Sequence, residues 1–273
     1  MLRTIVVPLD GSEFANRALP VANSIAQFGH VSMRIVGVAP ADDQLAWIFD
    51  HVHAAARSVT NGSVPKVDII IDPDPATVML GVADEPGNVL CFAGHDRSRF
   101  AAKVMRSVGS ELMARATWPF VLVGEGAARN DCGRDVVVAV DGRGDPEPLL
   151  AVAAPWASRL QSRLRIVTVY EPVPADLRRP AHYTRHHGPA GDPEEYLEGL
   201  ADDVARYGTT NVSTAAIADP ISPPAGLQSY VLAHPARLLV VGGRKRDTHP
   251  IGGTIRTLLS SVSAPMLVVN GPA

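Results

Sequence analysis

The stretch from Ile5 to Ser12 reads IVVPLDGS, a short apolar strand that stops at a carboxylate, a glycine and a hydroxyl. Much the same phrase returns as VVVAVDGR at Val136 to Arg143, where Asp141 stands 131 positions after Asp10. In a chain of 273 residues, a repeat at this distance favours two domains of similar length over one large domain.

Each copy of the phrase is followed by the same alternation of strands and helices. After the first copy, apolar residues three or four positions apart predict one helix face, and Ser12 is placed to cap the start of that helix. Strands that alternate with helices predict parallel pairing through right-handed crossovers. The predicted strands cover residues 4–9, 32–39, 66–72, 88–94 and 119–124, then 135–141, 164–172, 211–218, 237–243 and 265–270.

The domain division follows from this repeat. Near-continuous apolar strands suit a sheet that helices cover on both faces, so each half is expected to be a doubly wound α/β domain. We expect the first domain at residues 1–125, a short polar linker at 126–134 and the second domain at 135–273. The halves differ chiefly at residues 174–193, a long loop rich in proline and glycine, where we expect disorder.

Composition narrows the classes of partner and compartment. The net charge of −3 gives no electrostatic reason to expect binding to nucleic acid or to an anionic membrane. No stretch approaches the roughly 20 apolar residues that span a bilayer, and charged residues interrupt the apolar N-terminus too early for a signal peptide. Two cysteines, Cys91 and Cys132, are too few for a disulfide framework, so a cytoplasmic location is expected.

Several phrases in order resemble the universal stress protein family. They are residues 7–12, 36–40, 89–99 and 106–124 in the first half, and residues 136–143, 164–172, 238–246 and 265–269 in the second. The resemblance covers almost the whole chain, and its strength lies in the order of the phrases. It implies a tandem member with two five-stranded domains, each with strand order 3-2-1-4-5 and of the adenine nucleotide alpha hydrolase-like type, packed as an intramolecular pseudo-dimer.

The resemblance also implies sites for an adenine nucleotide, ATP in the first place. Nucleotide-binding members use an acid at the end of strand 1, backbone at the end of strand 2 and a glycine-rich loop after strand 4 for the phosphates. Glycines let backbone N–H groups approach an anion, and the N-terminus of the following helix adds partial positive charge. The acid matches Asp10 and Asp141, and the strand-2 position matches Val38 and Val169.

The phosphate loop departs from the family pattern in both halves. The first half keeps only Gly94 and Ser107, because Arg106 stands where the last glycine belongs. A side chain at a missing glycine restricts φ and fills space that a phosphate needs. In the second half Lys245 replaces the middle glycine and the spacing is shorter, but more of the pattern is retained: Gly242, Gly243, Gly252, Gly253 and Thr254. We therefore expect the first site to be lost and the second to be remodelled.

Structural explanations compete with each of these signals. Asp10 and Asp141 can simply end a strand and cap a helix, and Gly94 and Gly242 can simply permit tight turns. A solvated helix start explains the basic residues Arg97, Arg99, Lys103 and Arg106, whereas Arg244 and Lys245 lie beside retained glycines. His182, His186 and His187 lack a ligand spacing, so no metal site is expected.

Two functions from different classes remain open. No catalytic signature is present, which predicts a protein that is not an enzyme, with Mg²⁺ bound only together with nucleotide. The first hypothesis is a regulatory stress-response protein with weak or remodelled ATP binding, at the second half if anywhere. The second is a nucleotide-independent scaffold with degenerate ATP loops that binds a partner protein.

The fifth strand of each half predicts how the halves meet. Residues 120–124 and 266–270 would each be an apolar sheet edge, and exposed apolar edges invite pairing. We expect the two strands to pair in antiparallel fashion and to bury each other. The sequence leaves open whether two whole chains associate further as a homodimer.

Overall fold

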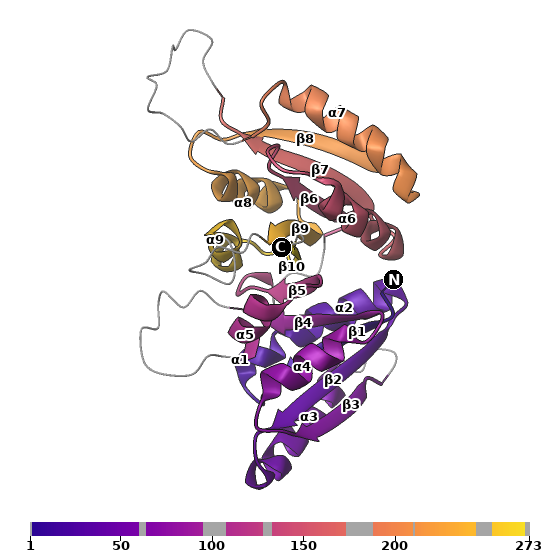
Figure 1. Cartoon of the computed structure of the whole chain (residues 1–273), viewed down its shortest axis with the longest axis vertical. Helices are drawn as coiled ribbons and strands as arrows, with labels where there is room; N and C mark the ends of the chain where they lie inside the picture. The colour runs from indigo at the N-terminus through magenta and orange to yellow at the C-terminus, as the bar shows by residue number, and fades with distance from the viewer. Residues whose placement is uncertain are drawn as a thin grey trace.

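The fold is one continuous sheet covered by helices on both faces (Figure 1). The computed structural model describes residues 2–59, 64–94, 108–127, 133–172, 188–209, 211–243 and 253–270. Within these residues ten strands pair in the order β3-β2-β1-β4-β5-β10-β9-β6-β7-β8. Each half therefore has the strand order 3-2-1-4-5, which confirms the expected fold class.

The first half runs through β5 and the second begins at β6. The first contains β1 (Thr4–Leu9), α1 (Glu13–Asn16), α2 (Ala18–Gly29), β2 (Ser32–Ala39), η1 (Asp42–Gln44), α3 (Leu45–Ser58), β3 (Lys66–Ile71), α4 (Pro75–Asp84), β4 (Asn88–Ala93), α5 (Val108–Arg115) and β5 (Phe120–Val123). The second contains β6 (Asp135–Val140), α6 (Glu147–Arg159), β7 (Arg163–Tyr170), α7 (Pro193–Val204), η4 (Ala205–Tyr207), β8 (Val212–Ala218), α8 (Pro223–Ala233), β9 (Ala236–Gly243), α9 (Gly253–Ser261) and β10 (Met266–Asn270).

Within each half the strand pairs are parallel, as the alternation of elements predicts. The sequence also predicts one helix start correctly, because the Ser12 hydroxyl accepts a hydrogen bond from the backbone N–H of Ala15 at 3.1 Å. The expectation of disorder is wrong for residues 188–193, where Asp192 caps α7. Residues 173–187 lie outside the described part, and the exact domain boundaries stay a prediction.

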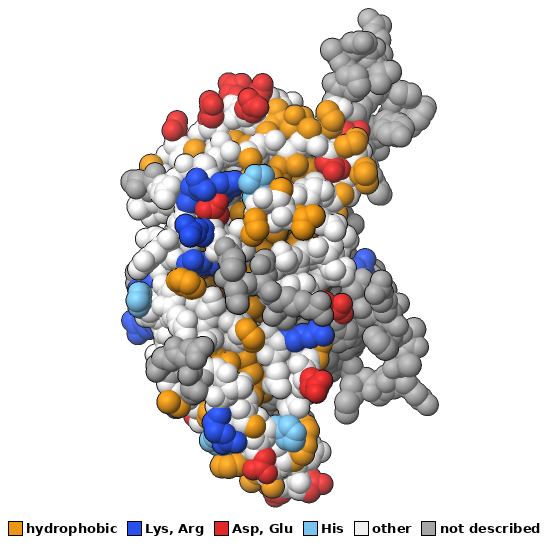
Figure 2. Space-filling model, turned by 180° about the vertical axis from the view of Figure 1, so that it is seen from behind, with side chains coloured by type: hydrophobic (Ala, Val, Ile, Leu, Met, Phe, Trp, Pro, Cys, Tyr) orange, Lys and Arg blue, Asp and Glu red, His pale blue; other side chains and the backbone are white. Residues whose placement is uncertain are grey.

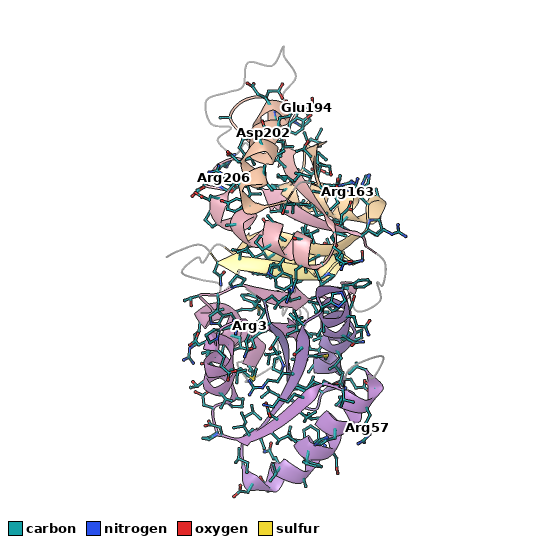
Figure 3. All side chains as sticks on the ribbon, turned by 90° about the vertical axis from the view of Figure 1, so that its right-hand side faces the viewer. Arg3, Arg57, Arg163, Glu194, Asp202 and Arg206 are labelled. Carbon is teal, nitrogen blue, oxygen red and sulfur yellow. The ribbon has the colours of Figure 1, made fainter. Side chains whose placement is uncertain are left out.

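Two hydrophobic cores lie on the two faces of the sheet. One contains apolar residues of α2, α3, α6 and α7, and the other contains apolar residues of α4, α5, α8 and α9. Both cores take residues from both halves, so the halves do not fold around separate interiors. Charged side chains such as Arg57, Glu194, Asp202 and Arg206 project from the outer surface (Figure 3).

The halves join through β5 and β10, which pair in antiparallel fashion as predicted. Phe120, Val121 and Leu122 face Val268, Leu267 and Met266 in register, and all six side chains are fully buried. The Asn270 side chain adds a hydrogen bond from Nδ2 to the carbonyl oxygen of Ala116 at 2.8 Å. A side chain at Gly124 would overlap the carbonyl oxygen of Leu259, so this glycine lets α9 approach β5. We call this β5–β10 contact the seam.

A second contact between the halves forms around Arg237 at the start of β9. Its guanidinium lies 3.7 Å from the centre of the Phe28 ring on α2. The same group donates to the carbonyl oxygens of Gly133 and Leu160. Burial, together with the charge of Arg134, lowers the pKa of Arg237.

Figure 2 shows Lys and Arg side chains gathered along one side of the second half, the side opposite the long grey loops.

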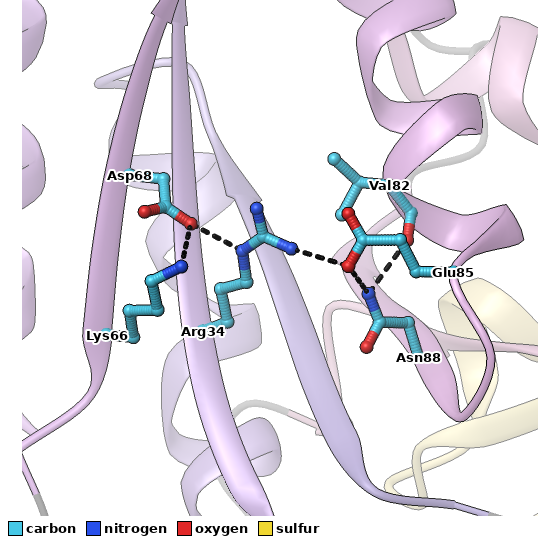
Figure 4. Close-up of polar contacts among 6 residues, drawn as sticks. All are labelled: Arg34, Lys66, Asp68, Val82, Glu85 and Asn88. Atoms are coloured by element: carbon cyan, nitrogen blue, oxygen red, sulfur yellow. Dashed lines mark hydrogen bonds and ion pairs between the residues drawn. The ribbon is translucent and has the colours of Figure 1, made fainter.

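An arginine at the same place on the second strand of each half supports the sheet. In the first half Arg34 on β2 binds Asp68 on β3 and Glu85 after α4 (Figure 4). Burial acts to raise the pKa of Asp68, but hydrogen bonds from Arg34 and Lys66 outweigh it, and the net result is a lowered pKa.

The corresponding arginine of the second half has different partners. Arg165 on β7 forms an ion pair with Asp135 on β6 at 3.0 Å and donates to the phenol oxygen of Tyr230 on α8. The duplicated position thus keeps its guanidinium, while each half supplies its own acceptors from neighbouring elements.

The ion pair between Arg34 and Asp68 predicts a stability that depends on pH. Asp68→Asn is expected to lower the free energy of unfolding near neutral pH by about 1–3 kcal/mol, because charge-assisted hydrogen bonds are lost. Since the folded-state pKa of Asp68 is lowered, the wild-type advantage is present above the ordinary carboxyl pKa and is lost as pH falls through the folded-state value. Urea denaturation of wild type and Asp68→Asn from about pH 7 to about pH 2 measures the difference in their free energies of unfolding. A difference that does not change with pH would contradict this role of Asp68.

The seam predicts that one buried seam residue stabilises both halves. Leu267→Ala is expected to lower the free energy of unfolding by about 2–5 kcal/mol, because Leu267 is fully buried. The matched control is Leu232→Ala, since Leu232 is 79% exposed and should change stability by no more than about 0.5 kcal/mol. Hydrogen exchange should report the Leu267→Ala loss in β1 as well as in β6. Protection lost in the second half alone would show that the halves are independent.

Candidate functional site

Ligands of doubly wound sheets bind beyond the carboxyl ends of the strands, and the expected site residues lie there. Asp10 and Gly94 follow β1 and β4 in the first half; Asp141 follows β6, and β9 ends at Gly243. Part of the expected site lies outside the described residues: Ser107, Lys245 and Gly252, with the basic residues Arg97, Arg99, Lys103, Arg106 and Arg244. His182, His186 and His187 also lie outside them.

In the first half the carboxylate of Asp10 holds the turn that follows β1. Its Oδ1 accepts hydrogen bonds from the backbone N–H of Ser12 at 2.9 Å and from the Ser12 hydroxyl at 2.6 Å. The Ser12 hydroxyl in turn caps α1. Gly11 between them has a φ of +81°, a conformation that favours glycine.

The indole of Trp47 covers this turn, which sequence reasoning missed. A side chain added at Gly11 would overlap the outer edge of the Trp47 ring. Trp47 stands in the first turn of α3 and remains 48% exposed, while Ile48 and Val52 of the same helix pack onto Gly37 of β2. The only signal in the sequence was an aromatic residue at the start of the helix after the second strand.

The retained glycine of the first half is used for packing. A methyl group added at Gly94 would lie 2.7 Å from Cδ1 of Leu122 and 3.4 Å from Cδ2 of Leu259. The N–H of Gly94 donates to the carbonyl oxygen of Val123 at 2.9 Å. Gly94 is therefore engaged by β5 and by α9, and the first half presents its acid beside a covered turn.

In the second half the carboxylate of Asp141 again holds the turn after β6. Its Oδ1 accepts hydrogen bonds from the backbone N–H groups of Arg143 at 3.1 Å and Gly144 at 3.3 Å. Here the turn meets the end of the long loop instead of an indole. A methyl group added at Gly142, whose φ is +67°, would lie 2.5 Å from the nitrogen of Pro189.

Tyr196 is a second residue that sequence reasoning missed. It stands in the first turn of α7, and its phenol oxygen is buried with no hydrogen-bond partner among the described residues. Burial raises the pKa of Tyr196, and the negative charge of Asp141 raises it further, so the two groups share one environment.

The glycines of the second half divide into open and occupied positions. Gly242 is exposed, and among the described residues a methyl group added there would meet only Cδ1 of Leu149, at 3.7 Å. Gly253 is the first residue of α9, and a side chain added there would have no atom of the described residues outside its own helix within 4 Å; Thr254 beside it is exposed. Gly243 is different, because a side chain there would overlap the amide oxygen of Asn270.

Both expected strand-2 positions have buried side chains, so only their backbone can meet a ligand. Val38 belongs to the core on the α4 and α8 side of the sheet, and Val169 packs against Gly226 of α8. A methyl group added at Gly188 would lie 3.2 Å from the carbonyl oxygen of Val169. The end of the long loop therefore lies over the ends of both β6 and β7.

The described residues show binding groups rather than a metal centre or a nucleophile. Within them no group of three or more His, Cys, Asp or Glu side chains could hold a metal ion. Cys91 is fully buried, and burial raises the pKa of its thiol far above the ordinary value. Among the described helices, none combines the length and apolar character that crossing a bilayer requires.

Three solved structures share the fold over nearly the whole chain. A universal stress protein from Archaeoglobus fulgidus has a TM-score of 0.64 at 14% identity, with 98% of each chain covered. A putative universal stress protein from Pseudomonas aeruginosa has a TM-score of 0.59 at 15% identity, covering 98% of this chain and 93% of that one. A functionally unknown protein from the same species gives 0.58 at 16% identity, with 98% and 92% covered. At these identities the likeness shows the fold alone.

The sequence comparisons place the chain in a family. No curated protein matches it. The model of the universal stress protein family matches residues 133–270, just over half of the chain and almost the whole second half. With two such halves joined in one sheet, this chain belongs to the universal stress protein family as a tandem member.

Proposed function

We propose that this protein is a non-catalytic regulatory protein of the stress response that binds an adenine nucleotide such as ATP in its second half. The observation that carries the proposal is the open pair of glycines, Gly242 at the end of β9 and Gly253 at the start of α9. Backbone N–H groups at such positions can approach phosphate oxygens, and the first turn of α9 adds partial positive charge. The Thr254 hydroxyl is exposed beside them.

The difference between the halves supports a single site per chain. In the first half Trp47 covers the turn at Gly11, and Leu122 and Leu259 occupy the space beside Gly94. A nucleotide there would have to displace an indole and packed leucine side chains. The second half keeps its acid, Asp141, with two open glycines, so binding needs less rearrangement.

The groups at the carboxyl ends of β6 and β9 are suited to binding a nucleotide. Asp141 is engaged by backbone N–H groups, and the open glycines and Thr254 offer hydrogen-bond donors. Efficient phosphoryl transfer requires a charge clamp and a positioned base, so we propose no turnover and assign Mg²⁺, if bound, to the nucleotide itself.

A buried free thiol at Cys91 suits a reducing cytoplasm, where we place the protein.

A nucleotide-independent scaffold is the second candidate, and specific contacts favour it. Pro189 lies against the Gly142 turn, and Gly243 makes room for Asn270, so part of the expected second site is already engaged. Trp47 and Phe49 on α3 are about half exposed and offer apolar surface to a partner protein. In this function the second half would bind no nucleotide.

A thermal-shift titration with ATP, ADP and AMP, each with and without Mg²⁺, tests the proposal. A ligand that binds only the folded state stabilises it by about 2.7 kcal/mol at a hundred times its dissociation constant, so a saturable shift is expected for wild type. Asp141→Ala should abolish the shift. The matched control Asp10→Ala, which removes the corresponding acid of the first half, should leave the shift unchanged.

Two results would count against the proposal. If no nucleotide shifts wild type at millimolar concentration, the scaffold function is favoured. If Asp10→Ala abolishes the shift and Asp141→Ala does not, the site lies in the first half.

A further inference from the structure

We propose that the outer edge of β8 binds an extended, basic segment of a partner protein, which adds to the sheet as a further strand beside the acidic helix α7. This inference concerns a different part of the molecule from the nucleotide site, so it does not depend on the proposed function. It is carried by the backbone of β8, which lacks a partner strand on its outer side, and by the negative charge of α7.

The backbone of β8 is paired on one side only. Among the described strands β8 is the last of the sheet, and it pairs with β7 alone. The carbonyl oxygen of Asn211 accepts from Leu164 at 3.0 Å, and the N–H of Asp219 donates to Tyr170 at 2.9 Å. Since backbone groups alternate in direction along a strand, the odd-numbered residues bond to β7. The N–H and C=O groups that point outward belong to Val212, Thr214, Ala216 and Ala218.

The strand β8 has none of the residue types that usually protect a sheet edge. Its sequence, VSTAAIA, contains no charged residue and no proline. The opposite edge strand, β3, carries Lys66 and Asp68, which form an ion pair at 3.3 Å, and Lys66 is 69% exposed. Charged side chains on an edge discourage the addition of another strand. The described residues therefore protect the β3 edge and leave the β8 edge available for pairing.

Helix α7 gives this end of the molecule a strong negative charge. It packs on β7 and β8, and residues 192–207 contain six carboxylates and one arginine. The arginine, Arg206, already forms an ion pair with Asp203 at 2.6 Å. In Figure 1 α7 and β8 lie at the upper end of the molecule, and Figure 2 shows Asp and Glu side chains gathered at the same end. The exposed carboxylates are those of Asp192, Glu194, Glu195, Glu198, Asp202 and Asp203.

This charge selects a basic segment over a second copy of the chain. In a twofold antiparallel pair of β8 strands, both α7 helices would lie on the same face of the joined sheet and would repel each other. A basic segment is attracted instead. Because side chains of a strand alternate between the two faces, Lys or Arg at every second position would face α7 while the backbone pairs with β8.

The first half provides an internal comparison. Its corresponding helix, α3, contains one acid, Asp50, and one arginine, Arg57, so their charges balance. The charged edge strand β3 thus stands beside a helix without an excess of acids, and the uncharged edge strand β8 stands beside an acidic helix. The two edges of the duplicated fold have opposite arrangements, and only the second suits a basic strand.

The test is NMR hydrogen exchange of the full chain, without nucleotide, in the presence of short peptides in which Val alternates with Lys or with Glu. In free wild type, the outward N–H groups of Thr214 and Ala216 are expected to exchange faster than those of Ala215 and Ile217, which bond to β7. The Val-Lys peptide should protect Thr214 and Ala216, and added salt should weaken this protection. The Val-Glu peptide should protect neither.

Two variants separate the backbone contribution from the charge contribution. Thr214→Pro removes an outward N–H at an exposed position of an edge strand, so it should keep the bonds to β7 and lower the affinity for the Val-Lys peptide at least about tenfold. Glu198→Lys on α7 should lower that affinity about threefold. The matched control Asp50→Lys makes the same kind of change at an exposed position of α3 and should leave the affinity unchanged.

Several results would overturn this proposal. They are equal affinity of wild type for both peptides, no protection of Thr214 by either peptide, and undiminished binding of the Val-Lys peptide to folded Thr214→Pro. A wild-type dimer that Thr214→Pro dissociates, measured by analytical ultracentrifugation, would show that a second copy occupies the edge. If Thr214→Pro does not fold, equal affinities of Glu198→Lys and Asp50→Lys would still overturn the role of α7. None of these results bears on nucleotide binding, so the proposed function is tested separately.

Discussion

The antiparallel pairing of β5 with β10 is the interaction on which the rest of the structure depends. Each half is a five-stranded sheet with an apolar terminal strand, and such an edge exposed to solvent would invite aggregation. Pairing Phe120, Val121 and Leu122 with Met266, Leu267 and Val268 buries both edges and makes one ten-stranded sheet. Because both cores then extend across the seam, the two halves share their hydrophobic interiors.

The same seam helps to make the two halves unequal. Helix α9 packs across it, so that Leu259 contacts both Gly94 and Gly124 of the first half. The glycine that a phosphate would need in the first half is thereby used for helix packing, while Gly253, at the other end of α9, has no contact with the other described elements. Trp47 and Tyr196 extend the difference, because each sets what lies beside the acid of its own half. A symmetric fold thus places different surroundings around the two corresponding acids.

Much of this architecture could be predicted from the sequence, because it depends on patterns that repeat. The phrase ending at Asp10 and Asp141 predicted two halves, and their apolar fifth strands predicted the seam. The surroundings of Trp47 and Tyr196 could not be predicted, since they depend on where α3 and α7 place their first turns. Nor could the packing role of Gly94, because Leu259 is distant in sequence and the glycine pattern alone does not reveal its neighbour.

We infer that one half of this symmetric chain has kept a nucleotide site and that the other half has lost it. The stoichiometry of ATP binding, measured by calorimetric titration of the full chain at protein concentrations above the dissociation constant, tests this claim most directly. We expect about one nucleotide per chain, because Trp47 covers the Gly11 turn, whereas the described residues leave the Gly242 and Gly253 positions open. Two equivalent sites per chain, or saturation at the first half alone, would contradict it.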